Sequence, residues 1–367
     1  MPSPIRSTTP RGGPRTVLVT GATGYIGSRL IPRLLRDGHT VRAAVTNLEK
    51  ARGRWWADEV ELVRMDVLDA DTVDEAVEGV DAVYYLIHAM AGADFAARDR
   101  EAAEVMAQSV AAAGVPTIVY LSGLVPDAPA DELSAHITSR LEVERILTGA
   151  SFGTSTFTLR AAIVTGSGST SFEIVRQISE RMPVQAIPAW MDSRVQPIAV
   201  VDVVEALAGA LRLNAESRSY DVGGPERMPY SLLLDRYAVA AGLNRPQVTV
   251  PGLPSDLVGT LAGVLTDVPT PTVEALVESL HHDMVCHDAE WTYDLLPEDH
   301  TLIGVDEAFS RALAAPDESL LPAERDPLGP MPGDPHWAGG QGGGLASAVA
   351  GARAVVTGLT GRLLPGR

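Results

Sequence analysis

A glycine-rich segment, TGATGYIG at residues 20–27, constrains the fold of this chain more than any other feature. The apolar run TVLVT at residues 16–20 before it is typical of a buried strand, and Ile26, Leu30 and Leu34 after it recur at helical spacing. Glycine permits a tight turn and a close approach of ligand to backbone, while the helix start offers free N–H groups to an anion. The segment therefore predicts a loop that binds the pyrophosphate of a dinucleotide, with contacts from Gly21, Ala22, Thr23, Gly24, Tyr25, Ile26 and Gly27.

The same alternation of apolar run, turn and helical pattern continues along the chain. Such repetition is how successive βαβ units appear in a sequence. We expect strands at residues 16–20, 39–45, 60–67, 81–88, 117–123 and 154–164, and a helix at 134–147. The fold class is thus α/β, a doubly wound parallel Rossmann sheet with a smaller C-terminal substrate lobe.

Changes in composition suggest the domain limits. Residues 1–14 are rich in helix breakers and predict a disordered extension, residues 15–222 a Rossmann domain, and residues 223–315 the substrate lobe, which residues 166–195 partly join. Residues 316–367 are rich in proline and glycine and are expected to be largely unstructured. The final stretch is either a weak amphipathic helix or a frayed tail.

Charge and cysteine usage exclude several classes of protein. The net charge of −18 and the pI near 4.8 disfavour binding to nucleic acid or to an anionic membrane surface. No apolar run approaches the roughly 20 residues that span a bilayer. A single cysteine, Cys286, excludes an internal disulfide and a cysteine-based zinc site, and we interpret it as a packing residue. We expect a cytoplasmic protein, either a monomer or a homodimer, whose partner is a small molecule.

The region after the second expected strand bears on the choice of dinucleotide. NAD-binding folds commonly place an acidic residue there to bind the adenine ribose, yet no acid occurs before Glu49. Arg42, Lys50 and Arg52 lie nearby, either as partners of a 2′-phosphate or as surface charges, so the pattern favours NADP(H) over NAD(H). At the ends of the next strands we expect Asp66 to contact the adenine amine and Val67 and Leu86 to line the cofactor site.

Five segments together resemble the short-chain dehydrogenase/reductase superfamily, in particular its extended and atypical branches, which include NAD-dependent epimerase/dehydratase-like and NmrA-like proteins. They are TGATGYIG, DVLD at 66–69, the VYLSG that carries Ser122, QPIAVVDV at 196–203 and YDVGGPE at 220–226. The resemblance covers about residues 15–315. It implies an NAD(P)-binding oxidoreductase or epimerase-like enzyme that acts on a small molecule of unknown identity.

The resemblance also implies catalytic positions, and here the chain departs from the family. Active members use a serine after the fifth strand, together with a tyrosine and a lysine four residues apart on the next helix. Ser122 matches the serine, but His136 stands at the tyrosine position and Arg140 at the lysine position. A histidine can exchange a proton near neutral pH, whereas an arginine is too basic to do so. His136 therefore either replaces the phenol or only contacts the cofactor, and Arg140 either binds the cofactor or pairs with a glutamate.

Two further features stay open. His88 ends the fourth expected strand, where ligands gather in doubly wound sheets, and is either a second acid/base group or a structural histidine. Trp190 and Met191 either line the substrate cleft or cover the core. Because the tyrosine and lysine are missing, the alternative function is a non-catalytic NADP(H)-binding redox sensor or accessory subunit.

Overall fold

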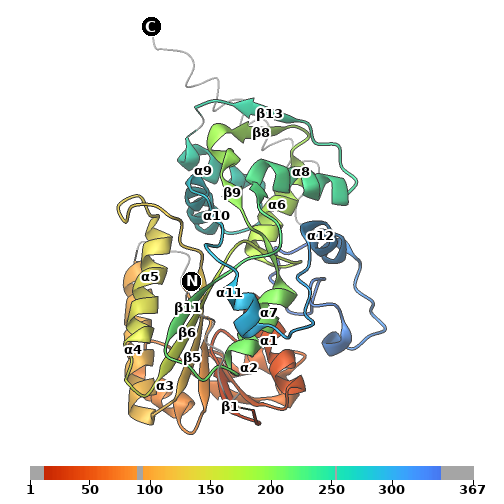
Figure 1. Ribbon diagram of the computed structural model, residues 1–367. Coiled ribbons are helices and arrows are strands. Elements are labelled where there is room, and N and C mark those ends of the chain that lie inside the picture. The colour runs from red at the N-terminus through yellow and green to blue at the C-terminus, as the bar shows by residue number, and fades with distance from the viewer. Residues whose placement is uncertain (1–11, 89–93, 253, 340–367) are drawn as a thin grey trace.

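A seven-stranded sheet organises the molecule (Figure 1). The structure is a computed structural model that describes residues 12–88, 94–252 and 254–339. All neighbouring strands of this sheet run parallel, in the order β11-β6-β5-β4-β1-β2-β3. The expected doubly wound Rossmann sheet is thereby confirmed. The strands are β1 (Thr16–Val19), β2 (Thr40–Val45), β3 (Glu61–Arg64), β4 (Ala82–Tyr85), β5 (Thr117–Gly123), β6 (Ser155–Ala161) and β11 (Arg218–Val222).

Helices cover both faces of this sheet, as Figure 1 shows. On one face lie α3 (Ala70–Val77), α4 (Phe95–Ala113) and α5 (Ala135–Thr148). On the other lie α1 (Tyr25–Arg36) and α7 (Val200–Ala210), which contact each other, and the short α2 (Leu48–Ala51) follows β2. The sequence analysis did not predict α4. That helix is rich in alanine and therefore gives only a weak apolar periodicity.

A second lobe stands above the carboxyl edge of the sheet. Three two-stranded ladders support it: β7 (Val164–Thr165) with β10 (Ile198–Ala199), β9 (Arg194–Val195) with β12 (Met228–Pro229), and β8 (Gln185–Pro188) with β13 (Gln247–Val250). Its helices are α6 (Thr170–Arg181), α8 (Tyr230–Ala240), α9 (Ser255–Leu265), α10 (Thr270–Glu278) and α12 (Val305–Leu313).

The boundary between the two parts is less simple than residues 15–222 and 223–315 suggest. Helix α11 (Glu290–Leu295) contacts α7 and β11, and its Trp291 and Leu295 are buried in the same apolar cluster as Val17 of β1. A segment from the expected substrate lobe therefore completes the core of the Rossmann domain.

The chain after residue 316 is only partly as expected. Residues 316–339 contain little regular structure, but they are held against the rest of the molecule. We call residues 326–339 the C-terminal strap. The buried guanidinium of Arg29, on α1, donates to the backbone oxygens of Pro327 and Gly329 and forms an ion pair of 2.7 Å with Asp334. This part of the expected unstructured tail is thus corrected. The weak helix considered for the final stretch, and residues 1–11, lie outside the described residues.

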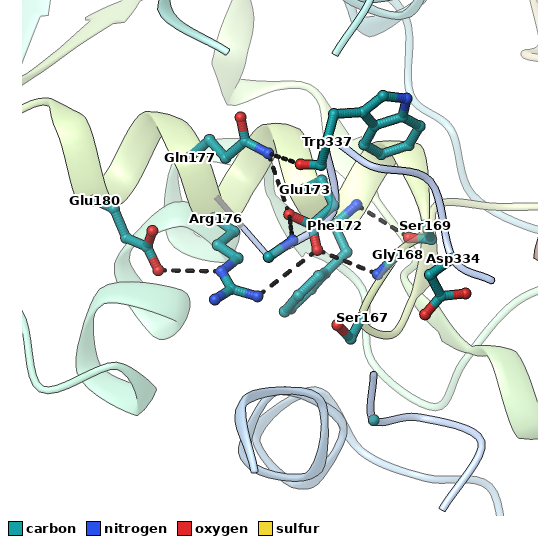
Figure 2. Close-up of polar contacts among 12 residues, drawn as sticks. Ser167, Gly168, Ser169, Phe172, Glu173, Arg176, Gln177, Glu180, Asp334 and Trp337 are labelled. Carbon is teal, nitrogen blue, oxygen red and sulfur yellow. Dashed lines mark hydrogen bonds and ion pairs between the residues drawn. The ribbon is translucent and has the colours of Figure 1, made fainter. Parts of the chain in front are cut away.

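A second anchor of the strap is a fully buried carboxylate on α6 (Figure 2). Glu173 accepts hydrogen bonds from the backbone N–H groups of Gly168 and Gly339, each at 3.1 Å, and from Gln177 at 3.2 Å. Gln177 also donates to the backbone oxygen of Trp337. Because a buried carboxylate is costly unless its oxygens are paired, these donors bind the strap firmly to α6.

Candidate active site

A cleft opens where β1 and β4, neighbours in the sheet, lead into chain segments on opposite faces. In doubly wound sheets ligands bind at this switch point, beyond the carboxyl ends of the strands. The cleft, called here the cofactor cleft, has a volume of about 290 Å³. The glycine loop, the ends of β4 and β5, α5 and the start of α6 line it.

The glycine loop has the geometry that a pyrophosphate requires. Gly21 has a φ of +62°, a backbone conformation that favours glycine. A Cβ on Gly27 would lie 2.4 Å from the backbone oxygen of Gly21, so no side chain fits where α1 packs against the loop. Gly24 precedes α1 and provides no side-chain acceptor for the first N–H groups of that helix. These N–H groups and the helix dipole suit an anion, so the loop fits a dinucleotide.

One hydroxyl fastens this loop to the neighbouring strand. Thr20 Oγ1 donates to the backbone oxygen of Tyr84 and accepts from the backbone N–H of Leu86, both at 3.0 Å. The sequence analysis treated Thr20 only as the end of a strand. The hydroxyl holds the loop beside Leu86, which lines the cofactor cleft as expected.

The other loop residues divide into two groups. Gly21, Gly24, Tyr25, Ile26 and Gly27 line the cofactor cleft. Ala22 is fully buried beneath the loop, and neither it nor Thr23 is among the lining residues. The hydroxyl of Tyr25 is buried against Gly166, and burial raises its pKa above the usual value.

Arg42 is not placed to bind a 2′-phosphate, which corrects the expectation. Its guanidinium donates to Glu61 and to the backbone oxygens of Ala76 and Glu78 at the end of α3. These partners lie by the start of β4, at the opposite edge of the sheet from the glycine loop. Arg52 pairs with Glu49.

Other residues do lie at the carboxyl ends of β2 and β3. Asp66 is exposed, and one carboxylate oxygen accepts from the N–H of Leu68, while Val67 is half-buried. Arg64 ends β3 in register with Val45, is exposed, and makes no side-chain hydrogen bond or ion pair with the described residues. The sequence analysis did not single out Arg64, because it lies in the third strand rather than after the second.

The expected catalytic side chains come together at the inner end of the cleft. Ser122, His136, Arg140 and His88 all line it. Ser134 caps α5 by accepting from the N–H of Ile137, and the spacing of four places His136 and Arg140 on one face of that helix. The rings of His88 and His136 meet edge to face, with centroids 6.3 Å apart. The structure therefore brings the four residues together in one place.

Burial and the nearby charge of Arg140 together set the protonation of the two histidines. Its Nε donates to Nε2 of His136 at 3.2 Å, and another nitrogen donates to the backbone oxygen of Leu121 at 3.2 Å. Burial, together with the charge of Arg140, lowers the pKa of His136 to about 4. His88 is accessible from the cleft. The low polarity of the protein around it, together with the charges of Arg140 and His136, holds its pKa well below the ordinary value. Both imidazoles are therefore neutral at physiological pH.

The tautomer of His136 follows from this contact. A neutral imidazole has one N–H, and Nε2 is the acceptor for Arg140, so the proton of His136 is on Nδ1. Nδ1–H is left as a hydrogen-bond donor. A neutral imidazole of this kind can polarise a carbonyl oxygen without first becoming charged.

Neither a cluster of metal ligands nor a candidate membrane-spanning helix occurs in the described part of the chain. There, no three His, Cys, Asp or Glu side chains are grouped so as to hold a metal ion. In the same residues no helix has both the length and the apolar character to cross a bilayer.

Comparison with known proteins agrees with this fold and this cleft. Residues 21–147 match a family model described as NAD(P)H-binding. The chain is 40% identical over 93 residues to a bifunctional dihydroflavonol 4-reductase/flavanone 4-reductase of Pyrus communis, and 44% identical over 75 residues to tetraketide alpha-pyrone reductase 2 of Arabidopsis thaliana. These matches cover 23% and 18% of this chain, and they span only about a quarter of the relatives' own length (26% and 23%).

Solved structures extend the likeness over most of the chain. A nucleoside-diphosphate-sugar epimerase from Staphylococcus aureus aligns with a TM-score of 0.65 at 13% identity, covering 80% of this chain and 99% of its own. A short-chain dehydrogenase/reductase superfamily protein from Agrobacterium tumefaciens, solved with bound NAD, aligns with a TM-score of 0.54 at 21% identity, covering 65% and 86%. At these identities the likeness shows a shared fold and nothing more.

Proposed function

Because residues 21–147 form an NAD(P)H-binding domain, we propose that the protein is a dinucleotide-dependent oxidoreductase that acts on a carbonyl or alcohol group of a small molecule. The observation that carries the proposal is the meeting of Ser122, His136 and Arg140 at the inner end of the cofactor cleft. A dinucleotide that served only as a structural support would not require polar side chains at this place.

Each of these side chains has a definite role in the proposal. The Nδ1–H of His136 and the hydroxyl of Ser122 donate hydrogen bonds to the substrate oxygen, where negative charge develops during reduction. Arg140 is a positioning residue, since it fixes the tautomer of His136 and adds positive charge behind it. His88, whose ring meets that of His136 edge to face, contacts the substrate beside it. When bound, the dinucleotide supplies or accepts the hydride, and the substrate oxygen takes its proton from, or releases it to, solvent water in the open cleft.

We further propose that the dinucleotide is NADP(H). No acidic residue ends β2 to accept hydrogen bonds from an adenosine 2′-hydroxyl, and two cations, Lys50 and Arg64, are exposed beside its carboxyl end. Arg64 takes the role that the sequence had suggested for Arg42.

A non-catalytic function, as an NADP(H)-responsive regulator, is the second candidate. It is favoured by the low pKa of both histidines, because neither one is a proton donor matched to neutral pH. In that case the dinucleotide would alter binding to a protein partner.

The test begins with the purified full chain, titrated with NADPH and NADH while the nicotinamide fluorescence is followed. Oxidation of the bound reduced cofactor is then measured over a panel of aldehydes, ketones and quinones. Turnover that falls at least tenfold in His136→Ala supports the oxidoreductase. Tight NADPH binding without turnover on any carbonyl supports the regulator, and no binding of either dinucleotide refutes both.

A further inference from the structure

Two small cavities continue inward from the cofactor cleft. The first, here the apolar passage, has a volume of about 110 Å³ and shares the walls at His136, Arg140 and Ser171 with the cleft. The second, here the apolar chamber, has about 130 Å³ and shares Ile174 and Tyr230 with the passage. Their shared walls place them in series behind the catalytic side chains.

The walls of the chamber carry almost no polar groups. Most of the lining residues belong to α6, β8, α8, α9 and α10, among them Ile178, Leu261 and Leu265, and Met191 joins them from the short helix Ala189–Asp192. Apart from Tyr230, Gln185 is the exception, and its amide is already satisfied by Ser179 and Gln247. An apolar cavity of about 150 Å³ stays dry and holds a molecule the size of benzene, so the chamber has room for part of a ligand rather than for a few waters.

One polar group marks the junction between the two cavities. Tyr230, at the start of α8, is 7% exposed and lines both the passage and the chamber. Its hydroxyl has no hydrogen-bond partner among the described residues, and burial raises its pKa above the usual value. The hydroxyl is not fully enclosed, so an acceptor on a ligand at the junction can reach it.

The charges of these walls distinguish between classes of substrate. Arg140, at the entrance, is the one cationic side chain among the residues that line the passage and the chamber. A nucleoside diphosphate would bring two phosphate charges into this space with a single partner for them. An uncharged apolar group instead gains about 0.8 kcal/mol for each methylene removed from water, which is about fourfold in affinity.

We infer that the substrate is a ketone or aldehyde with an apolar tail, which passes Tyr230 and ends in the chamber while its carbonyl oxygen lies against His136 and Ser122. The inference rests on the proposed oxidoreductase function for the reacting end of the molecule. The tail-binding site stands on the chamber itself and can be tested separately.

The first test uses straight-chain methyl ketones of increasing length with saturating NADPH. We expect kcat/KM to rise roughly fourfold per added methylene and then to level off once the chamber is full. Leu261→Trp should fill the chamber and abolish the rise, while short ketones react as before. The matched control is Val264→Trp on the same helix, because Val264 is 64% exposed and is not a lining residue. A kcat/KM that does not depend on the chain length of the ketone would overturn the inference. An equal loss of that length dependence in Leu261→Trp and Val264→Trp would also overturn it.

A second test needs no turnover. 1-Anilinonaphthalene-8-sulfonate is bound to the full chain and displaced by straight-chain alcohols, whose affinity should rise with length in the wild type and in Val264→Trp but not in Leu261→Trp. If Leu261→Trp does not fold, Ile178→Ala enlarges the chamber and should move the plateau to longer chains. Length-dependent displacement without ketone reduction would refute the oxidoreductase and keep the apolar site. If the affinity of the alcohols does not depend on their chain length, the apolar site is refuted.

Discussion

Arg140 donates from its Nε to Nε2 of His136 across 3.2 Å, and this contact separates the site from the tyrosine and lysine arrangement that the motifs suggest. In that arrangement the phenol exchanges a proton. Here the cation occupies the nitrogen that would accept one, so His136 stays neutral and offers only Nδ1–H. The pair is thus suited to polarising a substrate oxygen rather than to proton transfer.

The pH dependence of turnover should reflect this neutral histidine. Because the pKa of His136 is lowered to about 4, its neutral form persists as pH falls through 6.5 and is lost only in more acidic solution. We expect kcat/KM for carbonyl reduction to be flat between pH 6 and 8 and to fall on the acid side near pH 4 to 5. Rates measured at constant ionic strength check this, and an acid limb centred near pH 7 would contradict it.

Replacing Ser122 by alanine should slow the reaction without weakening cofactor binding. Loss of one donor to a developing oxyanion typically costs about 10²-fold in kcat. Single-turnover oxidation of bound NADPH gives the rate, and fluorescence titration gives its Kd. A change confined to the Kd would show that Ser122 supports the cofactor instead.

Gly27→Ala should abolish dinucleotide binding. The added Cβ would lie 2.4 Å from the backbone oxygen of Gly21, so the start of α1 must move away from the loop. Gly53→Ala is the control, since its Cβ would have nothing closer than 3.6 Å. Calorimetric titration with NADPH should show at least a hundredfold weaker binding in the first variant and no change in the second.

Arg64→Ala should reduce the preference for NADPH. Losing a charged hydrogen bond to a 2′-phosphate costs about 1.5–3 kcal/mol, so the Kd for NADPH should rise at least tenfold while that for NADH stays the same. Arg52→Ala, which removes an exposed ion pair with Glu49, serves as the comparison. Equal weakening of both dinucleotides by Arg64→Ala would assign that residue a structural role.

Asp334→Asn should destabilise the fold although Asp334 does not line the cofactor cleft. The exchange leaves the guanidinium of Arg29, whose side chain is 1% exposed, without its counter-charge, and breaking such a pair costs about 3 kcal/mol. Urea denaturation measures the loss. The control is Glu49→Gln, which breaks the ion pair with Arg52, in which both side chains are exposed. It should lower the free energy of unfolding by less than about 0.5 kcal/mol. Similar small losses in both variants would show that the strap contributes little.

Local patterns predicted six of the seven strands of the sheet, all except β11. The fifth strand matches residues 117–123 exactly as read, and the helix expected at 134–147 is observed as Ala135–Thr148, because apolar runs and a serine cap are encoded by neighbouring residues. The loop glycines were found for the same reason.

Contacts between distant residues were beyond such patterns. Arg42 looked available from its position in the sequence, but its partners at Ala76 and Glu78 come from another unit of the fold. The strap was expected to be a tail because proline and glycine disfavour regular structure, yet Arg29 and Glu173 hold its backbone against the rest of the molecule, in addition to hydrogen bonds within the strap. The apolar chamber draws on several elements far apart in the sequence, none of which signals a cavity by itself.

The bond between Arg29 and Asp334 joins residues 305 positions apart. At synthesis rates of about 5–20 residues per second, roughly 15 to 60 seconds pass between the translation of the two. During that time the first helix after the glycine loop carries a guanidinium without its final counter-ion. A nascent chain interrupted before the strap would therefore present the dinucleotide loop on an unfinished scaffold.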